Sequence, residues 1–405
     1  MPKCIQITGD SSYGGAGYLV LEWCRYLLAR GWEVDVLATD PLWVGMLEQV
    51  PGVRVVKHIH IPRDISLAED ARAFGQLLSL MRRRRYDLVH TYTATPGFLG
   101  RIAARLAGAP AIVHHQAGWT VTDYSSFLER VVYTPLEFLA VMASTKSICV
   151  SHAVAQQALR LHIAPSGKLV TICNGIDPGP FVSATQDDSR QLARREVGVT
   201  EGHLLIGNTS RLSRQKDNES LIRAMGFLKP LLANTPFTLV LAGDGPDSRR
   251  LSDLAIALGL AESVRFLGFR QDIPRLLAAL DVFVNPSLWE GLSISLLEAM
   301  AAARPIVTTS IPPNAELVEH EVTGLLVPPQ APEAIARAIA RFVHEPGLAT
   351  ACGAAARKRV VESYSVDRML QETWDLYVSL LADEGLREPQ GSSLGGHVAD
   401  RIPHR

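Results

Sequence analysis

Residues 282–309 read VFVNPSLWEGLSISLLEAMAAARPIVTT, and this stretch carries the clearest fold signal in the chain. An apolar run of strand length, Val282–Asn285, opens it, and a second run, Ile306–Thr309, closes it. Between them a short loop leads into a helical pattern that begins near Ser293. Strands that are apolar on both faces and alternate with helices are typical of parallel βαβ units. The stretch therefore predicts a parallel sheet covered by helices.

The same alternation runs through most of the chain. In the first half we predict strands at Cys4–Thr8, Glu33–Ala38, Val53–Lys57, Asp87–Thr91, Ala111–His115 and Ser147–Ser151. In the second half we predict strands at His203–Asn208, Thr238–Ala242, Val264–Leu267, Val282–Asn285 and Ile306–Thr309. The predicted class is α/β, with two Rossmann-like doubly wound domains that face each other across a cleft. Such sheets bind ligands beyond the carboxyl ends of their strands.

The chain length sets the number of domains. At 405 residues the chain exceeds the size at which one core stops growing. A turn-rich segment around Asn174–Pro180 marks the boundary, so we predict Rossmann-like domains at 1–176 and 177–365. We expect a C-terminal helix at 366–387 that packs back toward the first domain. Residues 388–405 carry few large apolar groups, and we expect a disordered tail.

Composition narrows the classes of partner and compartment. The formal net charge is −1, which gives no electrostatic case for nucleic acid. The 5 cysteines are scattered without a CxxC pair, as expected for a reducing compartment. No signal-peptide pattern and no apolar run of membrane-spanning length occurs, so we expect a cytoplasmic protein whose membrane contact, if it has one, is peripheral.

Two glutamates stand near the start of the helix in the opening stretch. Glu290 lies in the loop and Glu298 in the first turns of the helix, so both carboxylates can reach one cleft. Carboxylates suit sugars because they accept charge-assisted hydrogen bonds from neighbouring hydroxyls. The free amides where the helix begins, around Gly291, Leu292 and Ser293, add a site for polar or anionic ligand oxygens. The alternative is structural: Ser295 and Glu298 have the spacing of a capping box.

The segment Pro286–Met300 resembles the E-x7-E motif of retaining glycosyltransferases of family 4, the "glycosyl transferases group 1", which have the GT-B fold. The resemblance implies that Glu298 binds the nucleotide ribose and that Glu290 contacts the transferred sugar. It also implies that the second domain holds the donor and the first holds the acceptor. The sequence departs from the family at Arg304, where we place the glycine that relatives usually carry before the next strand.

A second segment, Ile206–Asp217, resembles the family's diphosphate grip, in which an arginine and a lysine stand five residues apart. Arg211 and Lys216 match those positions, with Arg214 as a competitor and a surface role as the alternative. The negative charge that develops on a diphosphate leaving group needs such cations. Gly14 and Gly15 match the family's glycine-rich loop near the donor phosphate, or form a tight turn without a ligand.

Histidines and metals complete the candidate site. Relatives carry a His-Gly pair where this chain reads Ala117-Gly118, so we look upstream to His114 and His115. Only one of them can face the cleft, and we favour His115 as a catalytic residue, with a structural histidine as the alternative. No Asp-x-Asp motif follows a strand end, and we expect neither a metal nor another cofactor.

The resemblance implies transfer of a sugar from a UDP- or GDP-linked donor to a glycan, lipid-linked or small-molecule acceptor, in cell-envelope or exopolysaccharide synthesis. A basic run, Arg82–Arg85, fits a solvated helix end better than the alternative, an anionic membrane surface. An apolar stretch, Tyr124–Met142, could add an apolar face at such a surface, and a core helix explains it as well. The alternatives are a non-catalytic carbohydrate-binding protein and an NAD-dependent oxidoreductase. The latter lacks the G-x-G-x-x-G spacing.

Overall fold

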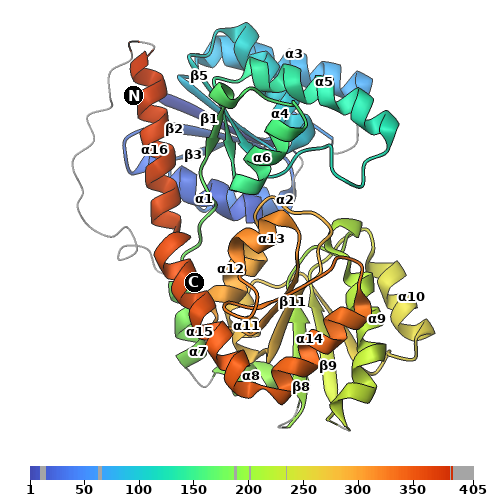
Figure 1. Cartoon of the computed structure of the whole chain (residues 1–405). Coiled ribbons are helices and arrows are strands. Elements are labelled where there is room, and N and C mark those ends of the chain that lie inside the picture. The colour runs from blue at the N-terminus through green and yellow to red at the C-terminus, as the bar shows by residue number, and fades with distance from the viewer. Residues whose placement is uncertain are drawn as a thin grey trace. The chain divides into compact units, whose positions relative to one another are not determined.

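The computed structural model describes residues 1–9, 15–62, 66–186, 189–199, 202–233, 235–383 and 385. The chain divides into two compact units (Figure 1). The first unit contains Met1–His115, Leu139–Lys146 and Thr373–Arg405, and the second contains Gln116–Phe138 and Ser147–Glu372.

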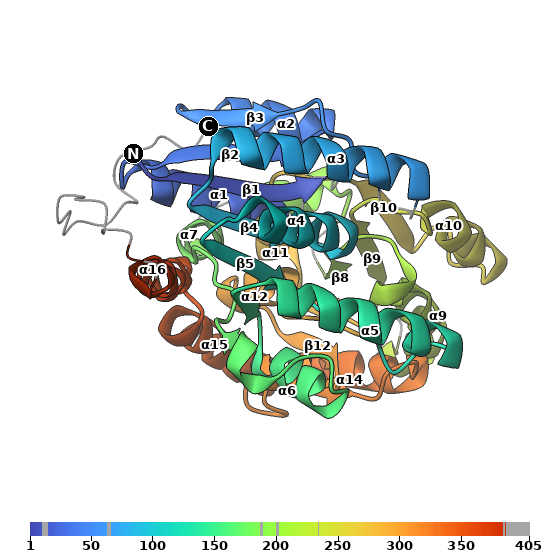
Figure 2. The same cartoon turned by 90° about the horizontal axis from the view of Figure 1, so that it is seen from above.

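The first half of the chain builds a seven-stranded sheet in the order β3-β2-β1-β4-β5-β6-β7. Its strands are β1 (Lys3–Gly9), β2 (Glu33–Ala38), β3 (Val53–Val56), β4 (Leu88–Tyr92), β5 (Ala111–Gln116), β6 (Lys146–Cys149) and β7 (Leu169–Thr171). The helices are α1 (Gly15–Leu28), α2 (Pro41–Glu48), α3 (Leu67–Arg84), α4 (Ala94–Ala107), α5 (Phe127–Ala143) and α6 (His152–Arg160). Helices α3 and α4 pack against each other and share a core with β1, β4 and β5 (Figure 2).

The second half builds a six-stranded sheet in the order β10-β9-β8-β11-β12-β13. Its strands are β8 (Leu204–Asn208), β9 (Phe237–Ala242), β10 (Val264–Gly268), β11 (Val282–Asn285), β12 (Ile306–Thr309) and β13 (Leu325–Val327). The helices are α7 (Gly179–Gln186), α8 (Ser189–Glu196), α9 (Asn218–Leu228), α10 (Ser248–Ala257), α11 (Ile273–Ala279), α12 (Ile294–Ala301), α13 (Pro312–Leu317), α14 (Pro332–His344) and α15 (Pro346–Ser363).

The sheet order positions the candidate site. Strands β8 and β11 are neighbours in the middle of the sheet, paired in parallel with Val282 opposite Ile206. The order reverses here, because β8 continues outward to β9 and β11 continues outward to β12. The loops that leave the carboxyl ends of two adjacent parallel strands at such a reversal converge. One loop carries Arg211 and Lys216, and the other carries Glu290.

The sequence predictions of strands are confirmed, with ends that differ by no more than two residues. Two strands were missed, β7 and β13, and each has only 3 residues. A strand of that length shows no periodicity of its own, since its pairing depends on a neighbour that the sequence does not reveal.

The long helix α16 (Val366–Asp383) follows α15 and ends the described helical part of the chain. Within the first unit, Tyr377 shares a hydrogen bond with Nδ1 of His90, and Trp374 lies edge-on to Tyr26 with ring centroids 6.2 Å apart. Aromatic side chains therefore join the second half of α16 to the rest of the first unit. The predicted tail at 388–405 lies outside the described residues.

Candidate active site

Glu290 lies in the loop between β11 and α12, and its carboxylate is already bound by protein groups. Its Oε1 accepts hydrogen bonds from Lys216 Nζ at 2.5 Å and from Ser287 Oγ at 2.7 Å. The side chain is only 6% exposed, and that of Lys216 is 15% exposed. The structure thus joins two residues that the sequence analysis singled out separately, one from each loop.

Residues that the sequence analysis missed hold the Glu290 loop in place. Gln215 accepts the backbone N–H of Leu288 at 2.8 Å through its own carbonyl, and its side chain donates to the Trp289 carbonyl at 2.9 Å. Ser287 donates to Glu290 as described above. Gln215 directly precedes Lys216, and Ser287 lies in the same loop as Glu290, so their closeness to recognised positions was the available signal.

The turn that carries Lys216 is a single 3₁₀ turn, Arg214–Lys216, followed by Asp217 in a left-handed conformation with φ 42°. The Asp217 side chain accepts a hydrogen bond from Ser220 N and so caps the start of α9. Arg211 precedes this turn in the same loop, and its side chain is exposed. Three cations thus stand on the connection between β8 and α9, namely Arg211, Arg214 and Lys216, and Lys216 forms an ion pair with Glu290.

Helix α12 begins at Ile294 with Ser293 as its N-cap residue. The Ser293 hydroxyl accepts the N–H of Leu296 at 3.4 Å and receives the Asn285 side-chain amide at 3.1 Å. The capping-box alternative for Ser295 and Glu298 is therefore wrong, because Ser295 lies inside the helix and Ser293 does the capping. Glu298 therefore does not occupy the third helical position, which a capping box requires.

Glu298 is half-buried on α12. Burial raises the pKa of its carboxyl to about 8. Among the described residues, no side chain or backbone amide is found within hydrogen-bonding or ion-pairing distance of that carboxyl group. A shielded carboxyl without a protein partner is suited to hydroxyl groups of a ligand, because each hydroxyl supplies the missing donor.

Gly291 is closely enclosed by residues of the same unit. A Cβ atom built at this position would lie 1.9 Å from the Ala117 carbonyl oxygen, and Ser151 Oγ donates to the Gly291 carbonyl at 2.8 Å. Only glycine therefore fits beside Glu290 in this backbone arrangement. Leu292, the next residue, is buried at 5% exposure, so its side chain serves packing while its amide belongs to the helix start.

The two candidate histidines separate onto opposite faces of β5. His114 shares a 2.8 Å hydrogen bond with the Thr91 hydroxyl, and its ring lies close to Gly97 of α4. His115 is 4% exposed, with its ring centroid 5.4 Å from Tyr92 and 6.1 Å from His90. His115 therefore belongs to a buried aromatic group of the first unit, and its catalytic role stays a prediction.

The glycine-rich loop is described only in part. Gly15 is the first residue of α1, so the predicted strand-to-helix transition ends there. Gly14 lies outside the described residues.

The turn from α12 to β12 corrects the sequence analysis. The residue with the left-handed backbone is Ala303, with φ 51°, so the conformation that favours glycine lies at Ala303 and not at Arg304. Arg304 instead donates to the carbonyls of Ala302 at 2.9 Å and Leu280 at 2.9 Å. Burial, together with nearby arginines, lowers the pKa of its guanidinium to about 10. Arg304 thus supplies hydrogen-bond donors to backbone carbonyls next to this turn.

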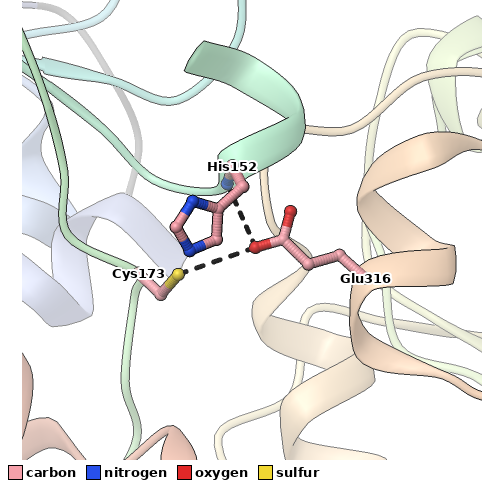
Figure 3. Close-up of side chains that lie close together, drawn as sticks. All are labelled: His152, Cys173 and Glu316. Atoms are coloured by element: carbon pink, nitrogen blue, oxygen red, sulfur yellow. Dashed lines mark hydrogen bonds between the residues drawn. The ribbon is translucent and has the colours of Figure 1, made fainter. Parts of the chain in front are cut away.

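His152, Cys173 and Glu316 form a cluster whose potential ligand atoms lie within 4.8 Å of one another (Figure 3). Glu316 accepts the backbone N–H groups of His152 and Ala153 at 3.0 Å each, and Cys173 donates to it at 3.7 Å. The carboxylate thus caps the start of α6. Burial raises the pKa of the Cys173 thiol to about 11, which opposes thiolate ligation. We assign this cluster to holding α6 against α13.

Comparison with known proteins identifies the family. Residues 13–179 match the model described as Glycosyltransferase Family 4, and residues 189–359 match the model described as Glycosyl transferases group 1. The chain belongs to family 4 of the glycosyltransferases. It is an enzyme that transfers glycosyl groups, which removes the oxidoreductase and the non-catalytic binding protein as alternatives.

Individual relatives cover most of the chain. An uncharacterised glycosyltransferase of Methanocaldococcus jannaschii is 31% identical, over 87% of this chain and 90% of its own length. The UDP-Gal:alpha-D-GlcNAc-diphosphoundecaprenol alpha-1,3-galactosyltransferase of Escherichia coli is 29% identical, over 80% of this chain and 83% of its own length. HepE of Anabaena, solved in complex with UDP-glucose, superposes with a TM-score of 0.80 at 23% identity, over 93% of this chain and 99% of that one.

These likenesses confirm the predicted GT-B class for this glycosyltransferase, with its two parallel sheets of α/β type. Among the described residues, no helix combines the length and the apolar character that crossing a bilayer requires.

Proposed function

We propose that this glycosyltransferase uses a UDP- or GDP-linked sugar as donor and transfers the sugar with retention of its anomeric configuration. The observation that carries the proposal is the ion pair between Lys216 and Glu290, which stands on the same sheet edge as the unpartnered carboxyl of Glu298. This edge offers the Lys216 cation to a diphosphate, the Glu290 carboxylate to a sugar ring and the Glu298 carboxyl to a ribose. The relatives that act on UDP-galactose or were solved with UDP-glucose support a nucleotide-sugar donor.

Each residue has a distinct part in the proposed reaction. Lys216 and Arg211 bind the diphosphate and stabilise its charge as the glycosidic bond breaks. Glu298 accepts hydrogen bonds from the ribose, and Glu290 holds the sugar ring and stabilises positive charge at the anomeric carbon. The donor site is completed by the backbone amides around Gly291, Leu292 and Ser293 and by the loop with Gly14 and Gly15. His115, on β5, is the candidate catalytic histidine.

We propose further that the acceptor is a glycan or a lipid-linked sugar of cell-envelope or exopolysaccharide synthesis. The Escherichia coli relative acts on a diphosphoundecaprenol-linked acceptor, which supports the lipid-linked class. The protein would then work on the cytoplasmic side of the membrane, in peripheral contact with it. No metal takes part in this proposal, since Lys216 and Arg211 supply the positive charge that a divalent ion would otherwise bring to the diphosphate.

The donor class can be tested by thermal shift and calorimetry with UDP, GDP and their sugars, and NAD as the control. We expect a nucleoside diphosphate and its sugar to bind and NAD not to bind. Incubation with the stabilising donor and an acceptor extract should release the nucleoside diphosphate, and NMR of the product should show the donor's anomeric configuration. An inverted product would contradict the retaining mechanism, and binding of neither nucleotide would contradict the donor site.

A further inference from the structure

Helix α5 exposes an entirely apolar face. Its exposed large side chains are between 39% and 82% exposed: Phe127, Leu128, Val131, Val132, Leu136, Phe138, Leu139 and Met142. Pro135, inside the helix, is exposed as well. At 3.6 residues per turn, all of these except Leu136 fall within an arc of about 140°. No charged or hydrogen-bonding side chain interrupts this arc, which we name the α5 apolar face.

The side of α5 that faces the protein carries polar side chains as well as the buried apolar residues Ala140 and Val141. Glu137, 9% exposed, accepts hydrogen bonds from the backbone N–H and the hydroxyl of Thr120 at 3.3 and 2.6 Å. Tyr133 and Thr134 on the same side are half-buried. A helix of a water-soluble surface shows the reverse arrangement, with apolar groups inside and polar groups outside. The core-helix explanation of this stretch is therefore wrong, and the apolar face requires an apolar environment.

The dimensions and chemistry of the face favour lipid over a protein. From Phe127 to Met142 it extends over about 23 Å at 1.5 Å per residue, and a continuous apolar face is typical of helices that lie in a membrane interface. A protein partner would meet about one hydrogen-bonding group for every 100–200 Å² of contact, and this face offers none. The residues that follow α16 bring only Leu386, Leu394, Val398 and Ile402 as large apolar side chains, too few to cover it.

The face begins beside the candidate active site. Tyr124, just before α5, lies with its ring centroid 5.6 Å from that of Trp289, and both belong to the second unit. Trp289 directly precedes Glu290, the proposed sugar contact. An acceptor whose lipid tail stays in the apolar environment around α5 would thus bring its head group toward the loop of Trp289 and Glu290.

We propose that the α5 apolar face inserts into the cytoplasmic leaflet of a lipid bilayer and so presents lipid-linked acceptors to the Glu290 loop. The inference rests on the proposed function for the identity of the acceptor, but the binding of lipid rests on α5 alone. Because apolar burial drives it, the association resists salt, unlike attraction between cations and anionic lipids.

Co-sedimentation of the full chain with vesicles of phosphatidylethanolamine and phosphatidylglycerol tests the surface. We expect the wild-type protein to bind and to stay bound at about 0.5 M NaCl. The double variant Leu128→Glu/Leu139→Glu should lower binding at least about tenfold, because two charges enter the interface. Ile256→Glu is the matched control, because Ile256 lies on α10, outside α5, and is 63% exposed. This variant should bind vesicles as the wild-type protein does.

Several outcomes would overturn the proposal. Wild-type protein that stays in the supernatant, or binding that salt abolishes, contradicts apolar insertion. A dimer that the double variant converts to a monomer, without vesicle binding, assigns the face to a second copy of the chain. Calorimetry with the nucleoside diphosphate separates the two proposals: the double variant should keep wild-type nucleotide affinity. Vesicle binding without any nucleotide binding would uphold the lipid surface and contradict the donor assignment.

Discussion

Glu290 and Glu298 belong to one loop-and-helix segment, yet their carboxyl groups lie in opposite environments. Glu290 is almost fully enclosed and receives Lys216 and Ser287 at hydrogen-bonding distance. Glu298 is half-buried, has no such partner among the described residues, and its pKa is raised to about 8 by burial. The protein therefore holds the Glu290 carboxylate in place before a ligand binds. The Glu298 carboxyl obtains hydrogen-bond donors only when a ligand supplies them.

From this difference we propose that the two groups act at different stages of the reaction. A carboxylate fixed by neighbours costs no reorganisation when charge develops, so Glu290 suits the transition state. A carboxyl without a partner gains most from a bound hydroxyl, so Glu298 suits binding of the nucleotide. The ion pair also means that replacing Lys216 removes the counter-charge of Glu290 at the same time as a diphosphate contact.

The largest effect is expected for Lys216→Ala, which should lower turnover by about 10²–10³. It leaves the enclosed Glu290 without its counter-charge and the leaving group without a cation. Initial rates with the identified donor measure the loss. Arg211→Ala should act in the same direction, and Arg249→Ala, an exposed charge on α10, is the control. Wild-type turnover of both site variants in folded form would contradict the diphosphate assignment.

Substitution of each glutamate separates the two environments. Glu298→Gln should weaken the free nucleoside diphosphate and the whole donor alike, by about 1.5–3 kcal/mol, the scale of a hydrogen bond to a charged group. Glu290→Gln should leave the affinity for the free nucleotide nearly unchanged and lower turnover instead. Calorimetric titration beside initial rates measures both. If Glu290→Gln lost nucleotide affinity as strongly as Glu298→Gln, the division of roles would be wrong.

The pH dependence of stability tests the environment of Glu298 without any ligand. Its carboxyl has a pKa of about 8 in the folded protein against 4.5 as the ordinary value, so the folded state binds the proton more tightly. This contribution to stability is fully present below pH 4.5 and is lost as the pH rises through about 8. Urea unfolding from pH 5 to pH 9 should show a smaller decline for Glu298→Gln than for the wild type. Parallel curves would show that Glu298 titrates normally.

The smallest effects concern ions in solution. If Lys216 and Arg211 provide the positive charge, chelation should leave turnover unchanged. Raised salt should weaken donor binding, because salt screens the exposed Arg211, although the enclosed Lys216 limits the loss. Rates with EDTA and with added Mg²⁺ or Mn²⁺ measure the first, and titrations at several NaCl concentrations measure the second. Loss of activity with EDTA and specific rescue by one divalent ion would refute metal independence.

Much of the fold and the family could be predicted from local patterns in the sequence. All strands except β7 and β13 were predictable because buried parallel strands are continuous apolar runs, and the E-x7-E segment with Arg211 and Lys216 pointed to the family. The glycine position was misassigned to Arg304, since the left-handed residue is Ala303 and a one-residue shift in a turn leaves no trace in composition. The capping box failed for the same reason, because Ser293 and Ser295 are equivalent as caps until the helix start is known.

The sequence by itself determined the α/β class and most of the two sheets, and it singled out the charged residues that we propose for the donor site, because these depend on short-range periodicity and spacing. Only the tertiary structure decided which groups meet. The parallel pairing of β8 with β11 brings Lys216 to Glu290, the elements packed on the two faces of β5 place His114 beside Thr91 and His115 beside Tyr92, and the surroundings of α5 turn its apolar side outward. Contacts between distant segments follow from strand order and from the direction in which each helix faces, and neither is encoded in a local pattern.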